Sequence, residues 1–130
     1  MNPRLLIAGA VFAAAVGLTG VALAGANDYL FEPVKAEIKK GDDVIVAVRL
    51  THKPTGKPVT DAVIIRTRID MTPDGMADME APLSPLPGNE PGIYAFKTDL
   101  STGRWLLSIT AKVQGEPETV AGKITFKAIK

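Results

Sequence analysis

Residues 93–113, which read IYAFKTDLSTGRWLLSITAKV, decide the fold. Two runs of alternating apolar and polar residues flank the turn Ser101-Thr102-Gly103. Successive side chains of a strand point to opposite faces, so each run predicts a strand with one apolar face. In the second run that face consists of Trp105, Leu107, Ile109, Ala111 and Val113. The stretch therefore predicts an antiparallel hairpin packed on a core, with Trp105 as a core residue.

The same period continues on both sides of this hairpin. A last strand is predicted around Val120–Ala128, and Val44–Thr51 forms a strand after the turn Gly41-Asp42-Asp43. Residues 29–38 predict an earlier strand that Pro33 restricts to an edge. A further strand is expected over residues 61–71, and its apolar side would carry Val63, Ile65, Thr67 and Ile69. About seven short strands with frequent turns predict an all-β, immunoglobulin-like antiparallel β-sandwich.

Between these strands lies a segment that is rich in helix breakers. Residues 72–91 contain five prolines and two glycines. Proline removes a backbone donor and clashes with the preceding helical turn, so the sequence predicts no helix here.

The first 26 residues have the pattern of an export signal. Arg4 is followed by an apolar run and by two small-x-small sites, Ala22-Leu23-Ala24 and Ala24-Gly25-Ala26. The interpretation favoured is a cleaved signal peptide over residues 1–26, followed by one domain over 27–130. The alternative is an N-terminal helical anchor in the inner membrane, because residues 5–26 carry no charge over 22 positions. Either interpretation predicts a periplasmic or secreted domain, or one that faces the periplasm.

Composition excludes several classes of function. After residue 26 the chain has 15 − 1 = 14 basic and 14 acidic residues and no basic block, so nucleic-acid binding is not expected. It has no cysteine and a single histidine, His52. Neither a nucleophile motif nor a phosphate-binding glycine loop is present. The sequence therefore predicts a protein that is not an enzyme.

Methionine is concentrated in one place. Met71, Met76 and Met79 fall within nine residues, and the only other methionine is Met1. Thioether sulfur is a soft ligand that suits Cu(I). The pattern predicts a copper site at these methionines, with His52 as a fourth ligand if its turn lies nearby. The alternative is an apolar lid that fills gaps at the end of the sandwich.

The same segment also has part of a calcium-loop pattern. Asp70, Thr72, Asp74, Gly75 and Asp78 fall at loop positions 1, 3, 5, 6 and 9. Position 12 is Ala81 instead of a bidentate acid, which disfavours calcium.

Over about residues 40–129 the chain resembles the FixH/YtkA-like family of exported bacterial domains. The resemblance is carried by Gly41-Asp42, Gly56-Lys57-Pro58-Val59, the methionine segment, Gly92-Ile93-Tyr94 and Gly103-Arg104-Trp105-Leu106-Leu107. It implies an immunoglobulin-like sandwich and a role beside metal handling, with a metal-efflux or respiratory-oxidase assembly protein as partner. By this analogy the metal-binding loop maps onto Met71, Met76 and Met79.

Two functions follow as hypotheses. The first is an extracytoplasmic domain that binds or delivers Cu(I) through Met71, Met76, Met79 and His52. The second is a metal-free interaction module whose exposed methionine segment docks on a membrane or periplasmic protein.

Overall fold

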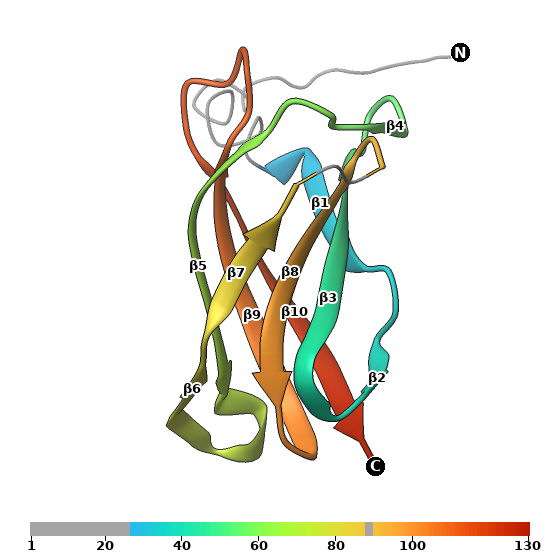
Figure 1. The fold of residues 1–130 in the computed structure, drawn as a ribbon. Helices are drawn as coiled ribbons and strands as arrows, with labels where there is room; N and C mark the ends of the chain where they lie inside the picture. Colours follow the sequence, from blue (N-terminus) through green and yellow to red (C-terminus); the bar gives the residue numbers. More distant parts are fainter. Residues whose placement is uncertain (1–26, 88–89) are drawn as a thin grey trace, which may run out of the picture.

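The computed structural model describes residues 27–87 and 90–130, which form a sandwich of two sheets (Figure 1). The first sheet contains β1 (Tyr29–Pro33), β3 (Gly41–His52), β8 (Ile93–Leu100), β7 (Leu83–Leu86) and the short β4 (Lys57–Pro58). The second contains β2 (Glu37–Lys39), β10 (Val120–Ile129), β9 (Gly103–Lys112), β5 (Val63–Met71) and β6 (Met76–Ala81). The all-β, immunoglobulin-like sandwich predicted from the sequence is confirmed, with ten strands in the described residues rather than about seven.

The core lies between the sheets and is built by the alternation seen in the sequence. All five predicted inward residues of 105–113 are buried. Phe96 and Leu100 of the other sheet, and Ile124 and Phe126 of the adjacent β10, belong to the buried core as well. The Nε1 atom of Trp105 donates a hydrogen bond of 2.9 Å to the carbonyl oxygen of Ser101, which satisfies its only polar atom. Removing this apolar surface from water is the main force that holds the two sheets together.

The expectation of one strand over residues 29–38 is wrong, because this segment passes from one sheet to the other. β1 pairs antiparallel with β3, whereas β2 pairs parallel with β10. The pairing of β1 with β3 ends at Pro33 and Val48, and one further hydrogen bond of 2.9 Å runs from the N–H of Val34 to the carbonyl oxygen of Ala47. The β2–β10 pair is also the one departure from antiparallel pairing in the part of the chain described here.

β5 departs from the predicted alternation at Ile65. Its register with β9 shifts between Ile64 and Arg66, so one extra residue bulges out of the ladder. Ile64 therefore packs against the core, while Val63 and Ile65 are 64 % and 55 % exposed. Beyond the bulge Ile69 is buried as expected.

Among the described positions, residues 72–91 contain no α-helix, as the prolines indicated. They do contain regular secondary structure. A 3-10 turn at Thr72–Asp74 joins β5 to β6, and β7 follows. The predicted signal or anchor over residues 1–26 lies outside the described residues. Within the described ranges, the structure contains no helix of the length and apolarity that crossing a membrane requires.

Candidate functional site

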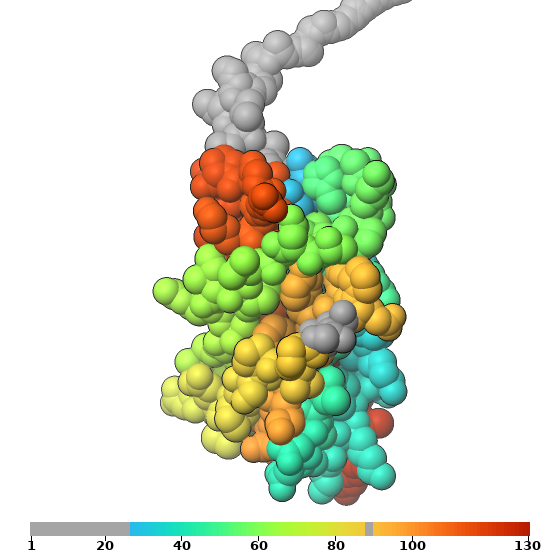
Figure 2. All heavy atoms as spheres, turned by 45° about the horizontal axis from the view of Figure 1, so that its top comes forward, coloured from blue at the N-terminus to red at the C-terminus, as the bar shows by residue number. Residues whose placement is uncertain are grey.

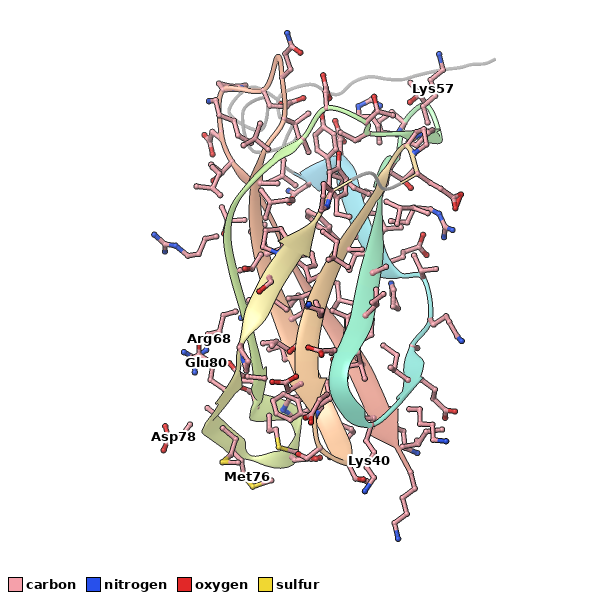
Figure 3. The ribbon with its side chains drawn as sticks, in the orientation of Figure 1. Lys40, Lys57, Arg68, Met76, Asp78 and Glu80 are labelled. Atoms are coloured by element: carbon pink, nitrogen blue, oxygen red, sulfur yellow. The ribbon has the colours of Figure 1, made fainter. Side chains whose placement is uncertain are left out.

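The methionine segment forms a hairpin at one end of the sandwich. β5 ends at Met71, the 3-10 turn reverses the chain, and Met76 begins β6 directly across from Met71. Gly75 adopts a left-handed conformation with φ 76° at the end of the turn. Figure 3 shows Met76 at this end, on the side of the sandwich that also carries Arg68, Asp78 and Glu80.

Arg68 holds the two strands of the hairpin together. Its Nε atom lies 2.6 Å from Oδ2 of Asp70, and one terminal nitrogen lies 2.9 Å from Oε1 of Glu80. The other terminal nitrogen donates a 2.8 Å hydrogen bond to the carbonyl oxygen of Ala77. One guanidinium thus bridges β5 to two positions on β6, and its planar set of donors fits this task.

Arg104 ties the turn of the hairpin to β9. Its Nε atom lies 2.7 Å from Oδ1 of Asp74, and its backbone N–H donates to Oδ2 of the same carboxylate at 2.9 Å. A second side-chain nitrogen donates to the carbonyl oxygen of Pro73 at 3.0 Å. The turn is therefore fixed from outside the hairpin as well as within it.

Two of these carboxylates, Asp70 and Asp74, are held in their charged form. Burial opposes ionisation of Asp70, but hydrogen bonds from Thr72 and Arg68 outweigh it and lower its pKa. The backbone and side-chain hydrogen bonds from Arg104 lower the pKa of Asp74. Both carboxylates already bind arginines that hold the hairpin in place, which argues against the calcium interpretation. The described residues also contain no group of three or more His, Cys, Asp or Glu side chains placed to hold an ion.

The three methionines lie in two different environments. Met76 and Met79 are 45 % and 51 % exposed on β6, as the sequence analysis expected of this segment. The expectation of exposure is wrong for Met71, which is 4 % exposed and belongs to the core cluster. Gly103 of β9 lies against the Met71 methyl group, so closely that a Cβ atom at this glycine would overlap it.

His52 is not near the methionines. It ends β3 at the opposite end of the sandwich, beside Lys57 of β4, whereas Met76 lies at the end where β3 begins (Figure 3). Its Nδ1 atom is 2.9 Å from Oγ1 of Thr55, and its ring lies against Tyr29 with centroids 5.2 Å apart. The structure therefore does not bring His52 together with Met71, Met76 or Met79, and the expected fourth ligand is absent from that set.

An open cleft of 740 Å³ adjoins the hairpin at the same end of the sandwich. It is lined by residues 40–42, 80–82 and 99–102, which lie at strand ends and in the adjoining turns, and by Trp105. Glu80 belongs both to this cleft and to the Arg68 contacts, so the hairpin forms part of one wall.

Sequence reasoning found the exposed methionines but missed the two arginines that hold them in place. Arg68 and Asp70 are two residues apart in a strand, so their side chains share a face, and this spacing is a signal that could have been used. The Arg104–Asp74 contact spans 30 residues and had no local signal.

Likeness to solved structures is limited. The C-terminal domain of ZirS has a TM-score of 0.44 at 13 % identity, covering 80 % of this chain and 67 % of that one. A conjugative transposon lipoprotein from Bacteroides eggerthii DSM 20697 has a TM-score of 0.31 at 13 % identity, covering 75 % and 93 %. Neither likeness is close enough to support a statement about function.

Comparison with curated proteins finds no match. The model of the YtkA-like family, in contrast, matches residues 23–110, which begins and ends earlier than the resemblance read from the sequence. This match concerns the YtkA-like part of that resemblance and leaves the FixH-like part without support. Because the matched residues are well over half of the chain, the protein belongs to the YtkA-like family.

Proposed function

We propose that this protein is an extracytoplasmic Cu(I)-binding domain that holds the ion at Met76 and Met79. The observation that carries the proposal is a pair of half-exposed thioethers on a hairpin braced by two arginines. A methionine side chain in water exposes apolar surface, which costs free energy. Thioether sulfur favours Cu(I) over harder ions. The export pattern of residues 1–26 supports a location outside the cytoplasm.

Two thioethers leave the coordination shell of Cu(I) incomplete. Met71 is buried and His52 is at the far end, so neither supplies an accessible third ligand. An open site of this kind suits transfer, because an incoming ligand from a partner can reach the ion before the methionines release it. A metal-efflux protein or an assembly factor of a respiratory oxidase remains the partner class that we propose.

The test is a Cu(I) competition titration against a chromophoric chelator under reducing conditions. The double variant Met76→Leu/Met79→Leu keeps apolar volume and removes both sulfur atoms. We expect one-to-one binding by the native chain and a loss of at least about tenfold in affinity, or about 1.4 kcal/mol, in the double variant. Zn(II) should compete poorly, because neither a thiolate nor a second imidazole is available.

Met71→Leu is the matched control, since it removes a sulfur atom that is buried. Its Cu(I) affinity should equal that of the native chain. Equal affinities in the native chain and in the double variant would refute the proposal.

A second candidate function is a metal-free docking module. It is favoured by the position of the two exposed methionines beside the open 740 Å³ cleft, which together give one end of the sandwich an irregular and partly apolar surface. A partner complex that survives Met76→Leu/Met79→Leu would support docking, whereas one that is lost together with copper would support the metal site.

A further inference from the structure

One strand of the sandwich has an edge with no neighbour. β6 pairs with β5 only over Ile69–Met71, and Pro82 then carries the chain across to β7 in the other sheet. Residues 63–68 of β5 pair with β9 on one side, and no described strand lies on the other (Figure 1). Alternate backbone N–H and C=O groups of this segment therefore point to solvent.

The end strands β1, β2 and β7 carry features that oppose pairing with a further strand. β7 contains Pro85 and lies between Pro82 and Pro87, and β1 ends at Pro33. β2 is only three residues long. Proline and shortness are common protections of edge strands, and residues 63–68 contain no proline.

The open edge is apolar and borders a groove. Val63 and Ile65 are among the most exposed large apolar residues of the described chain, at 64 % and 55 %. A groove of 220 Å³ separates β5 from β7, with Ile64 and Thr67 on one side and Pro85 on the other. Figure 2 shows the two strands next to each other on one face of the molecule, β5 in green and β7 in yellow. The bulge at Ile65 turns this side chain outward, where an added strand could cover it.

Charge selects between possible occupants of this edge. The Arg66 side chain is exposed and makes no hydrogen bond or ion pair among the described residues. Lys112, the β9 neighbour of Val63, adds a second positive charge nearby. Antiparallel pairing of residues 63–68 with a second copy would place Arg66 opposite Ile65 of that copy, so neither Arg66 would gain an opposite charge. A strand that carries a carboxylate would pair with Arg66 instead.

We propose that residues 63–68 of β5 bind an extended segment of another protein, which adds a strand to the second sheet in line with β6. The segment that fits is apolar or β-branched at alternate positions and has one acidic residue opposite Arg66. Backbone hydrogen bonds would supply affinity, and the 220 Å³ groove and Arg66 would supply selectivity.

The test uses a defined peptide probe, fluorescein-Thr-Val-Thr-Glu-Thr-Val-Thr-amide, and its counterpart with Lys in place of Glu. Fluorescence anisotropy is measured with the purified chain in the form that the cell produces. We expect saturable binding of the acidic probe, and at least about tenfold weaker binding of the lysine probe. Ile65→Glu, which adds a charge that repels the acidic probe and blocks the edge, should weaken this probe by a similar factor.

The matched control is Ile45→Glu. Ile45 is 57 % exposed, similar to Ile65, but it lies in β3 of the other sheet, where it pairs with Lys97 of β8. This variant and Met76→Leu/Met79→Leu should bind the probe as the native chain does, which separates this surface from the copper site. Circular dichroism establishes that each variant is folded.

Three results would overturn the proposal. They are no saturable binding of either probe, equal loss in Ile45→Glu and Ile65→Glu, or a native dimer in sedimentation that Ile65→Glu converts to a monomer. The last result would assign the edge to a second copy of the chain.

Discussion

Met71 and Met76 are partners across the first rung of the hairpin, yet burial gives them different roles. The methyl group of Met71 packs into the core beside Gly103, whereas Met76 is 45 % exposed. Met71 stabilises the fold by filling space in the core, whereas the half-exposed Met76 side chain contributes little to the free energy of unfolding.

This difference predicts opposite outcomes for two alanine substitutions. Met71→Ala leaves a cavity in the core, so we expect it to lower the free energy of unfolding by about 2–5 kcal/mol. Met76→Ala should change it by no more than about 0.5 kcal/mol. Chemical denaturation without copper measures both, and similar values for the two variants would contradict the burial assigned here.

The exposure of Met76 and Met79 was predictable, because the methionines cluster in a segment rich in proline and glycine. The contacts that hold this segment in place were not predictable. The burial of Met71 depends on the close approach of β9 at Gly103, and the separation of His52 depends on the direction of β3. Both are contacts between distant parts of the chain, which a local pattern does not contain.

At the scale of elements, the hairpin is held by β9 as much as by its own strands. A Cβ atom on Gly103 would overlap the methyl carbon of Met71 and would approach Oδ2 of Asp74 to 2.9 Å. Gly103 also has a φ of 144°, which few other residues adopt. The glycine thus allows β9 to approach both the core methionine and the turn.

We therefore expect Gly103→Ala to lower the free energy of unfolding by about 1–3 kcal/mol and to loosen the turn. Gly115→Ala is the matched control, because Gly115 also has a positive φ, 90°, and has open space where a Cβ atom would lie. Thermal unfolding of both variants separates the clash from the backbone cost. Equal shifts in Tm would mean that the close approach is unimportant.

The elements differ in how well their sequence describes them. β9 and β10 pair in a regular ladder, and alternation of residue type predicted the buried face of β9 correctly. β5 alternates in sequence as well, but the bulge at Ile65 reverses the parity in its first half. A bulge is set by register with the neighbouring strand, and for this reason the exposed Val63 and Ile65 were expected inside. Pro33 was recognised as an edge signal, but nothing nearby indicated that the chain would change sheets after it.

At the scale of the molecule, the end opposite the hairpin is closed by a contact between the first and last parts of the fold. The Tyr29 hydroxyl of β1 donates a 2.8 Å hydrogen bond to Oε2 of Glu116 in the β9–β10 connection. Burial, followed by this hydrogen bond and the charge of Glu116, raises the pKa of Tyr29 to about 12.

This shift predicts a loss of stability at alkaline pH. The pKa of Tyr29 is higher in the folded chain than its ordinary value of 10.0, so its contribution is complete below pH 10 and is lost as pH rises toward 12. Glu116→Gln should lower the pKa of Tyr29 and reduce this loss. Phenolate absorbance measures the titration, and Tyr29→Phe separates it from that of Tyr94, whose pKa burial also raises. An unchanged titration in Glu116→Gln would contradict the assignment.

The N-terminal end of the described chain and the methionine hairpin lie at opposite ends of the sandwich. The backbone of Asp28, next to the first described residue, accepts a hydrogen bond from Lys53 just after β3 ends, whereas Met76 lies where β3 begins (Figure 3). β3 has 12 residues, which span roughly 40 Å at about 3.4 Å per residue. If residues 5–26 were retained as an anchor and β3 stood perpendicular to the membrane, the methionines would lie several Debye lengths above the lipid headgroups, at about 8 Å per Debye length. An ion bound at the proposed site would then be exchanged with proteins that are dissolved in the periplasm or that rise well above the bilayer, and the surface charge of the membrane would have little influence on the exchange.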